Sequence, residues 1–142
     1  MRSRMAVAVL AAAALVVALA VAGCGARGSH ALDGTSWRLT GWSLSSLDPN
    51  TFTITADFAG GQISGKSAVN SYSGSYTAGP GSAFSVGELT STLMAGPEPE
   101  MRAEQAYTTL LREAKSYSLK GGILTLSDAN GNESLIFTAA AR

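Results

Sequence analysis

The stretch Thr51-Phe52-Thr53-Ile54-Thr55-Ala56-Asp57-Phe58 decides the fold class, because polar and apolar residues alternate along it without a break. Successive side chains of a β-strand point to opposite faces of a sheet. One face of this strand is therefore apolar, and the other carries threonines and an aspartate, as expected for a sheet that is wetted on one side. The pattern predicts a strand over residues 52–58 with its threonine face exposed.

Similar runs of β-branched, aromatic and hydroxyl residues recur along the chain. We expect strands near residues 36–42, 52–58, 62–67, 71–78, 83–87, 89–93, 116–120, 123–127 and 133–138. Turn residues between the runs, such as Gly60-Gly61 and Asn130-Gly131, supply the backbone angles that hairpins require. Neighbouring strands are therefore predicted to be mostly antiparallel.

One segment, from about residue 99 to residue 114, has a helical repeat instead. Its apolar residues recur at spacings of three and four: Ala103, Tyr107, Leu110, Leu111 and Ala114. Pro99 suits the first turn, and Glu98, Glu100 and Glu104 lie near the start, where the helix dipole favours negative charge. The apolar stripe of such a helix needs a sheet to cover. The predicted fold class is α+β, mostly β: a small antiparallel open or cracked β-barrel packed by one amphipathic helix.

Residues 1–23 have the organisation of a signal peptide. Arg2 and Arg4 precede an unbroken run of Ala, Val and Leu after Met5, which is the order of a positive segment and an apolar segment in an export signal. The run is almost long enough to span a bilayer, so a retained transmembrane anchor is the alternative.

The residues that end this run, Val21, Ala22, Gly23 and Cys24, resemble the bacterial lipobox. In a lipobox, signal peptidase cleaves before the cysteine, which receives a diacylglycerol; acyl chains such as palmitate then hold the protein on a membrane. We therefore expect an exported lipoprotein, anchored to the bacterial cell membrane through Cys24 with its domain outside the cytoplasm. Acylation of the only cysteine would leave the folded part without disulfides or cysteine metal sites.

The remaining chain divides into a spacer, one domain and a tail. Residues 24–32 comprise the acylated cysteine and a Gly/Ala/Arg/Ser stretch typical of a flexible linker. Residues 33–138 form the domain, and residues 139–142 form the tail. His30, the only histidine, lies in the spacer, where we expect it to be solvated.

Charge and composition narrow the functional classes. The 142 residues have a formal net charge of zero and no block of like charges, so neither nucleic acid nor a polybasic membrane contact is expected. The domain has no histidine for a Ser-His-acid set, and no His/Cys/carboxylate cluster has metal-ligand spacing. Glu98 and Glu100 are two residues apart at a helix start and do not face each other. We expect no enzyme activity, no metal and no cofactor.

Three ordered motifs carry a family resemblance. Gly34-Thr35-Ser36-Trp37-Arg38-Leu39 opens the domain, Gly61-Gln62-Ile63-Ser64-Gly65 leads into Asn70-Ser71-Tyr72-Ser73-Gly74-Ser75-Tyr76, and Ser91-Thr92-Leu93-Met94-Ala95 precedes the helix. Together they resemble the META domain family, which includes HslJ-type bacterial lipoproteins. The residues that match its pattern, and that we expect to be structural, are Gly34, Trp37, Gly65, Asn70, Tyr72, Gly74, Tyr76 and Met94.

The resemblance implies an open or cracked barrel packed by one helix, similar in build to secretin-pilot lipoproteins. It implies an association with stress tolerance and envelope integrity, and no catalytic residues. The family has two cysteines where this chain has Val69 and Gly96, and their joint replacement suggests that the family pair can bridge. Val69 would then fill part of the space, and Gly96 would be explained by the backbone at the entry to Pro97.

Asn70, Tyr72 and Tyr76 are the most attractive functional candidates, although packing explains them better. Tyr72, Gly74 and Tyr76 share one strand face, where Gly74 would make room for the helix or a neighbouring ring. Trp37 and Trp42 fall on opposite faces of a regular strand, so one is expected in the core.

Two hypotheses about function remain. The first is a non-enzymatic, monomeric envelope lipoprotein that contacts an envelope protein or polymer, in stress-related envelope maintenance; its sign would be an exposed apolar patch on an edge strand. The second is a carrier of a small hydrophobic ligand or lipid in the barrel interior; its sign would be an interior pocket lined by apolar and aromatic residues.

Overall fold

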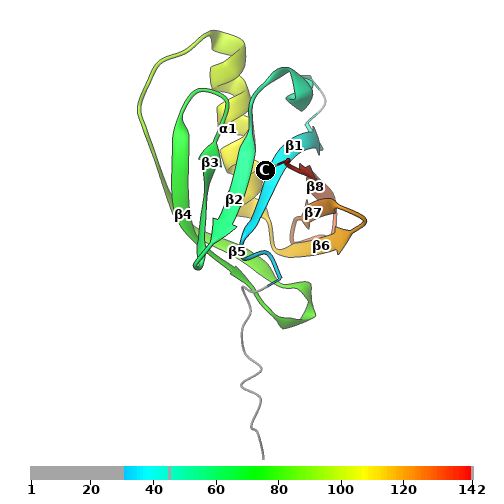
Figure 1. The fold of residues 1–142 in the computed structure, drawn as a ribbon. Coiled ribbons are helices and arrows are strands. Elements are labelled where there is room, and N and C mark those ends of the chain that lie inside the picture. Colours follow the sequence, from blue (N-terminus) through cyan, green and yellow to red (C-terminus); the bar gives the residue numbers. More distant parts are fainter. Residues whose placement is uncertain (1–30, 45, 142) are drawn as a thin grey trace, which may run out of the picture.

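A computed structural model describes residues 31–44 and 46–141 (Figure 1). In chain order the elements are β1 (Thr35–Trp42), the 3-10 turn η1 (Pro49–Thr51), β2 (Thr55–Ala59), β3 (Gln62–Lys66), β4 (Ser71–Ala78), the 3-10 turn η2 (Pro80–Ser82), β5 (Phe84–Ser91), α1 (Glu98–Glu113), β6 (Ser116–Lys120), β7 (Ile123–Ser127) and β8 (Glu133–Ala139). The strands form one antiparallel sheet in the order β5-β4-β3-β2-β1-β8-β7-β6. The predicted class, mostly β with one helix, is confirmed.

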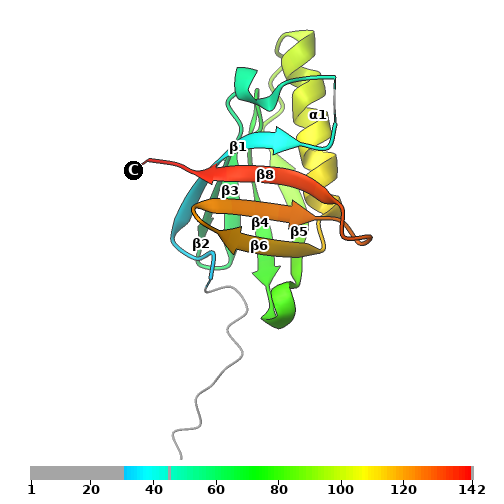
Figure 2. The ribbon, with the colours of Figure 1, turned by 90° about the vertical axis from the view of Figure 1, so that its right-hand side faces the viewer.

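The sheet curls until its two edge strands approach each other. Ala83, just before β5, bridges Ser116 of β6, and the backbone N–H of Phe84 donates to the Lys115 carbonyl oxygen at 2.9 Å. Helix α1 packs against β5 on one side and β8 on the other, so it covers the open side of the half-barrel (Figure 2). The expected open barrel packed by one helix is therefore present.

Extra residues bend three of the strand pairs. Thr40 is unmatched between β1 and β8, Ser134 between β8 and β7, and Gly87 and Glu88 of β5 together face Ser75 of β4. Such bulges increase the local twist of a sheet. They therefore favour the curl that brings β5 and β6 together.

The predicted strand over residues 52–58 begins later than expected, at Thr55. Pro49–Thr51 form a 3-10 turn that Asp48 caps, because its carboxylate accepts the Asn50 backbone N–H at 2.9 Å. Phe52 and Ile54 are nevertheless buried and Thr53 is exposed. The alternation thus predicts the faces correctly although the ladder is shorter.

Two further expectations are corrected by the bulges. The strands predicted at 83–87 and 89–93 are one strand, β5, because the chain passes through the bulge without leaving the ladder. Trp42 pairs with Leu135, and Leu39 pairs with Phe137, two residues away on β8. Trp42 is therefore on the same inner face as Leu39 and packs, half-buried, against the core, whereas a regular strand would place it outside.

Aromatic rings fill the interior of the barrel. The Phe58 and Tyr76 ring centroids are 4.7 Å apart, Phe58 and Phe84 6.4 Å, and Tyr107 and Phe137 6.3 Å. The predicted apolar stripe of α1 is buried among them, namely Ala103, Tyr107, Leu110 and Leu111, with Ala114 at the helix end. These side chains occupy the interior, which is where the carrier hypothesis expects a ligand.

The chain enters the domain at the end opposite the amino terminus of α1 (Figure 1). Gly60 at the β2–β3 turn donates its N–H to the Asp33 carboxylate at 2.5 Å, so the start of the domain lies beside that turn. In both views the β2–β3 turn and η2 lie at the end of the barrel opposite the amino terminus of α1 (Figures 1 and 2). In the described part of the chain no helix is long and apolar enough to cross a membrane.

Candidate functional site: the cleft between β5 and α1

Glu104 of α1 and Asn70, just before β4, form the centre of a polar network between the helix and the β3–β4 connection. The Glu104 carboxylate accepts hydrogen bonds from the Asn70 backbone N–H and side-chain amide and from the Ser67 hydroxyl, each at 2.7 Å. Asn70 and Ser67 are buried. The network therefore fastens the β3–β4 connection to the helix.

Asn70 also fixes the connection between β5 and α1. Its side-chain oxygen accepts the Met94 backbone N–H at 2.7 Å and the Thr92 hydroxyl at 2.8 Å, while its amide donates to the Met94 carbonyl oxygen at 3.2 Å. Asn70 thus bonds to the backbone of Met94 and not to its side chain. The side chains of Leu93 and Met94 are 96% and 57% exposed, although the chain that carries them is held in place.

The charge of Glu104 is favoured by its surroundings. Partial burial raises its pKa, but the hydrogen bonds from Asn70 and Ser67 outweigh this effect and hold the pKa below the ordinary value of 4.5. Glu104 is therefore ionised at neutral pH and acts as a hydrogen-bond acceptor. It anchors the two connections that Asn70 joins. A carboxyl group that donates a proton at neutral pH would need a raised pKa, and the pKa of Glu104 is lowered.

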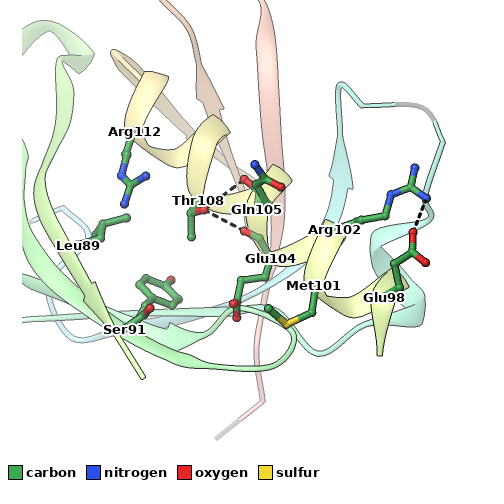
Figure 3. Close-up of a pocket in the computed structure, with 10 residues that line it drawn as sticks. Leu89, Ser91, Glu98, Met101, Arg102, Glu104, Gln105, Thr108 and Arg112 are labelled. Carbon is green, nitrogen blue, oxygen red and sulfur yellow. Dashed lines mark hydrogen bonds and ion pairs between the residues drawn. The ribbon is translucent and has the colours of Figure 1, made fainter. Parts of the chain in front are cut away.

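A cleft of about 420 Å³ lies between α1 and the edge strand β5. Figure 3 shows its walls: Leu89 and Ser91 from β5 face Met101, Gln105, Thr108 and Arg112 of the helix. A second hollow of about 300 Å³ is lined by Leu93 and Met94 and shares Ser91, Met101 and Glu104 with the first. We call this continuous groove the β5–α1 cleft.

The charged side chains of the cleft differ in whether they have a charged or hydrogen-bonding partner. Arg102 and Glu98 form an exposed ion pair of 3.8 Å, and Glu104 is engaged by its three donors. Arg112, from the last turn of α1, directs its guanidinium toward Leu89 (Figure 3), and among the described residues no carboxylate lies within ion-pairing distance of it. The Arg112 end of the cleft therefore carries a cation that no carboxylate of the described chain pairs with.

The other matched motif residues near the cleft have structural roles. Tyr72 of β4 donates its hydroxyl to the Thr55 carbonyl oxygen at 2.7 Å and receives the Tyr107 hydroxyl at 2.6 Å. Gly65 of β3 is the cross-strand partner of Tyr72, and a Cβ there would overlap the Thr55 carbonyl. Gly65 therefore lets Tyr72 reach across β3 to β2. Burial raises the pKa of both Tyr72 and Tyr107, so both phenols stay protonated.

Gly74 makes room for a strand, where the sequence suggested the helix or a ring. A Cβ at this position would lie 2.6 Å from the Glu88 carbonyl oxygen and 2.8 Å from Leu89 Cδ2. Glu88 is part of the β5 bulge, so Gly74 permits the bulge to approach β4. Tyr76 on the same face is buried and stacks 6.4 Å from Phe84.

Gly34 and Trp37 organise the start of the domain. Gly34 has a φ of 76° and donates its N–H to the Phe58 carbonyl oxygen at 2.6 Å. Trp37 is buried and donates its indole N–H to the Thr35 hydroxyl at 2.7 Å.

Positions 69 and 96 are neighbours. A Cβ built on Gly96 would lie 2.7 Å from Val69 Cγ2 and 3.5 Å from Val69 Cβ. Gly96 does not have a left-handed backbone, so the space taken by Val69 explains it, and not the backbone requirement suggested by the sequence.

Sequence reasoning missed Glu104, Arg112 and Leu93 as parts of one site. It explained Glu104 by the helix dipole alone, and the spacing of these residues carries no sign of a cleft. Cys24, the residues Val21, Ala22 and Gly23 before it, and His30 lie outside the described residues. Within the described ranges, no group of three or more His, Cys, Asp or Glu side chains could hold a metal ion.

Comparisons with known proteins give a family and a fold. A family model described as META domain matches residues 30–141. An NMR structure of a protein from Burkholderia xenovorans is similar, with a TM-score of 0.66 and 27% identity over 81% of this chain and 88% of that chain. A crystal structure of a DUF4847 family protein from Bacteroides vulgatus shares the fold, with a TM-score of 0.56 and 11% identity over 78% and 96% of the two chains. The search of curated proteins finds no match.

Proposed function

We propose that this chain, which belongs to the META domain family, is a membrane-anchored bacterial envelope lipoprotein whose domain is a non-enzymatic interaction module. The observation that carries this proposal is the exposure of Leu93 and Met94 on a connection that Asn70 holds rigidly. Exposed apolar side chains on an ordered backbone cost little entropy to bury against a partner. They also lie beside an edge strand, where an interaction surface is expected.

The position of this surface suits a protein tethered through Cys24. Cys24 and Ala31 are seven positions apart, and an extended chain spans at most about 3.6 Å per residue, so the tether could reach about 25 Å. The domain begins at the end opposite the amino terminus of α1. Met94 is joined to Asn70, which follows the end of β3 opposite the β2–β3 turn. Leu93 and Met94 would therefore lie away from the membrane-proximal end, where envelope partners involved in maintenance under stress could reach them.

The anchor is tested by Cys24→Ala. We expect the variant protein to leave the membrane fraction while its domain keeps the melting temperature of the wild type, because the acyl chains supply the membrane affinity. A variant that fractionates with membranes as the wild type does would refute the lipoprotein assignment.

The interaction surface is tested by purifying the acylated chain from detergent-solubilised membranes. A specific envelope protein should co-purify with the wild type and be lost with the double variant Leu93→Ser, Met94→Ser. Ile123→Ser is the matched control, since Ile123 is 45% exposed on another part of the sheet. Equal recovery from the double variant and the control, or no co-purifying protein at all, would contradict the proposal.

A further inference from the structure

The β5–α1 cleft has a free strand edge as one wall. β5 is a terminal strand of the sheet, and within the described residues only its beginning pairs with a strand other than β4, through the contacts of Ala83 and Phe84 with β6 and the residue before it. Among the described residues, the stretch from Val86 to Ser91 has no strand on the side away from β4. An exposed edge is a template for pairing with another chain.

The register of β5 shows which backbone groups are free. The Thr92 N–H donates to the Ser71 carbonyl oxygen of the β4 side at 3.0 Å. Backbone groups alternate in direction along a strand of an antiparallel pair, so those of Leu89 and Ser91 point away from β4. Leu89 and Ser91 are also the β5 residues that line the cleft.

The dimensions of the cleft fit an extended peptide. Its helical wall runs from Met101 to Arg112, which at 1.5 Å per residue is about 16 Å. An extended chain of about five residues has this length, at about 3.3 Å per residue.

The two ends of the cleft differ in chemistry. Leu93, Met94 and the half-buried Met101 make one end apolar. Arg112 gives the other end a cation without a carboxylate partner in the described chain. A ligand that complements both ends carries apolar groups and, about 16 Å away, a carboxylate.

We propose that the β5–α1 cleft binds an extended peptide segment of a partner protein, which adds a strand to β5 and places a carboxylate against Arg112. Leu89 lies near Arg112 (Figure 3), and Ser91 lies with Met101 and Leu93 at the apolar end, so β5 runs from the Arg112 end to the apolar end. A peptide antiparallel to β5 therefore runs from the apolar end to Arg112. The recognised segment therefore has apolar residues followed by an acidic residue or a carboxyl terminus. This inference rests on the proposed function, since it names the partner chemistry of the same surface.

A library of displayed random decapeptides tests the proposal, with the acylated full chain in detergent micelles as the target. We expect enrichment of sequences with alternating apolar residues before an aspartate or glutamate. A synthetic enriched peptide should bind Arg112→Glu at least about fivefold more weakly than the wild type, and Lys120→Glu equally well. Lys120 is the matched control because it is an exposed cation on the other edge strand. Replacing the acidic residue of the peptide by lysine should restore binding to Arg112→Glu.

Hydrogen exchange locates the peptide. The amide protons of Leu89 and Ser91 should exchange more slowly in the complex, because they would donate to the added strand. Protection confined to another strand, equal binding by Arg112→Glu, or no enriched sequence would overturn the inference. So would a dimer of the free chain that Arg112→Glu dissociates, since the cleft would then hold a second copy. If a partner still depended on Leu93 and Met94 in any of these cases, the interaction module would stand and only the peptide chemistry would fail.

Discussion

Cysteines introduced at positions 69 and 96 should form a disulfide that stabilises the domain. A Cβ on Gly96 would lie 3.5 Å from Val69 Cβ, within the range of about 3.5–4.5 Å found for disulfides. Gly96 has no left-handed backbone angle that would disfavour a cysteine. The double variant also removes the Val69 methyl groups, the nearest of which would be 2.7 Å from the new Cβ.

The expected gain follows from the length of chain that the bridge closes. A loop of about 27 residues corresponds to about 3–4 kcal/mol in the chain-entropy model. For a domain of this size, 1 kcal/mol shifts the melting temperature by about 4 °C, so the oxidised variant should melt roughly 12–16 °C above its reduced form.

The assay is thermal unfolding of Val69→Cys, Gly96→Cys in a Cys24→Ala background, with and without a reductant. Cys24→Ala removes the only native cysteine, so the new pair has no competitor. Gly96→Cys alone is the control, and it should be less stable than the parent because its Cβ meets Val69. Free thiols that persist under oxidising conditions, or equal melting temperatures for the two forms, would refute the placement of the β5–α1 connection against the β3–β4 connection.

Other substitutions test the core, the strand crossing and the polar network. Trp37→Ala and Leu110→Ala should each lower the free energy of unfolding by about 2–5 kcal/mol in urea titrations, as large-to-small core changes do; an unchanged transition would show that the residue is not in the core. Gly65→Ala should cost about 1–3 kcal/mol, since its methyl group would displace the Thr55 carbonyl, and an unaltered melting temperature would contradict that contact. Glu104→Gln should cost about 2 kcal/mol at pH 7 through lost charge-assisted hydrogen bonds. Because the pKa of Glu104 is lowered by folding, its stabilising contribution is present above the unfolded-state value of 4.5 and is lost as the pH falls through the lower folded-state pKa. The two proteins should therefore converge in stability as the pH is lowered below 4.5, and a constant difference would argue against this linkage.

Local periodicity explains what the sequence predicts well. The alternation of Phe52, Ile54, Ala56 and Phe58 sets an inner face whether or not each residue is in the ladder. The stripe on α1 is equally local, because residues three and four apart share one helix face. Both patterns require only that one face of the strand or helix be buried.

Bulges explain what the sequence does not predict. One extra residue reverses the alternation beyond it. The unmatched Thr40 therefore places Trp42 on the inner face, and the bulge at Gly87–Glu88 lies within one continuous strand, β5, where the sequence predicts two. An insertion of this kind is defined by the partner strand. It therefore cannot be recognised in one strand alone.

The candidate site depends on contacts between distant segments. Asn70 stands out in the sequence, but its partner Glu104 lies 34 positions away and has a sufficient local explanation as a dipole-favoured residue. The β5–α1 cleft exists because the sheet curls and the helix crosses its opening. Neither the edge of β5, which no described strand pairs with beyond its beginning, nor the guanidinium of Arg112, which no described carboxylate pairs with, has a sequence signature.

Direct contact at Leu93 in intact cells is the measurement that tests the account most closely. A photo-crosslinking amino acid placed at Leu93 should capture one specific envelope protein on illumination, and the same group at Ile123 should not. Both side chains are exposed, at 96% and 45%, so the domain should keep its melting temperature in each case. A single product specific to position 93 would support the interaction module. No product at position 93, or the same products from both positions, would contradict it.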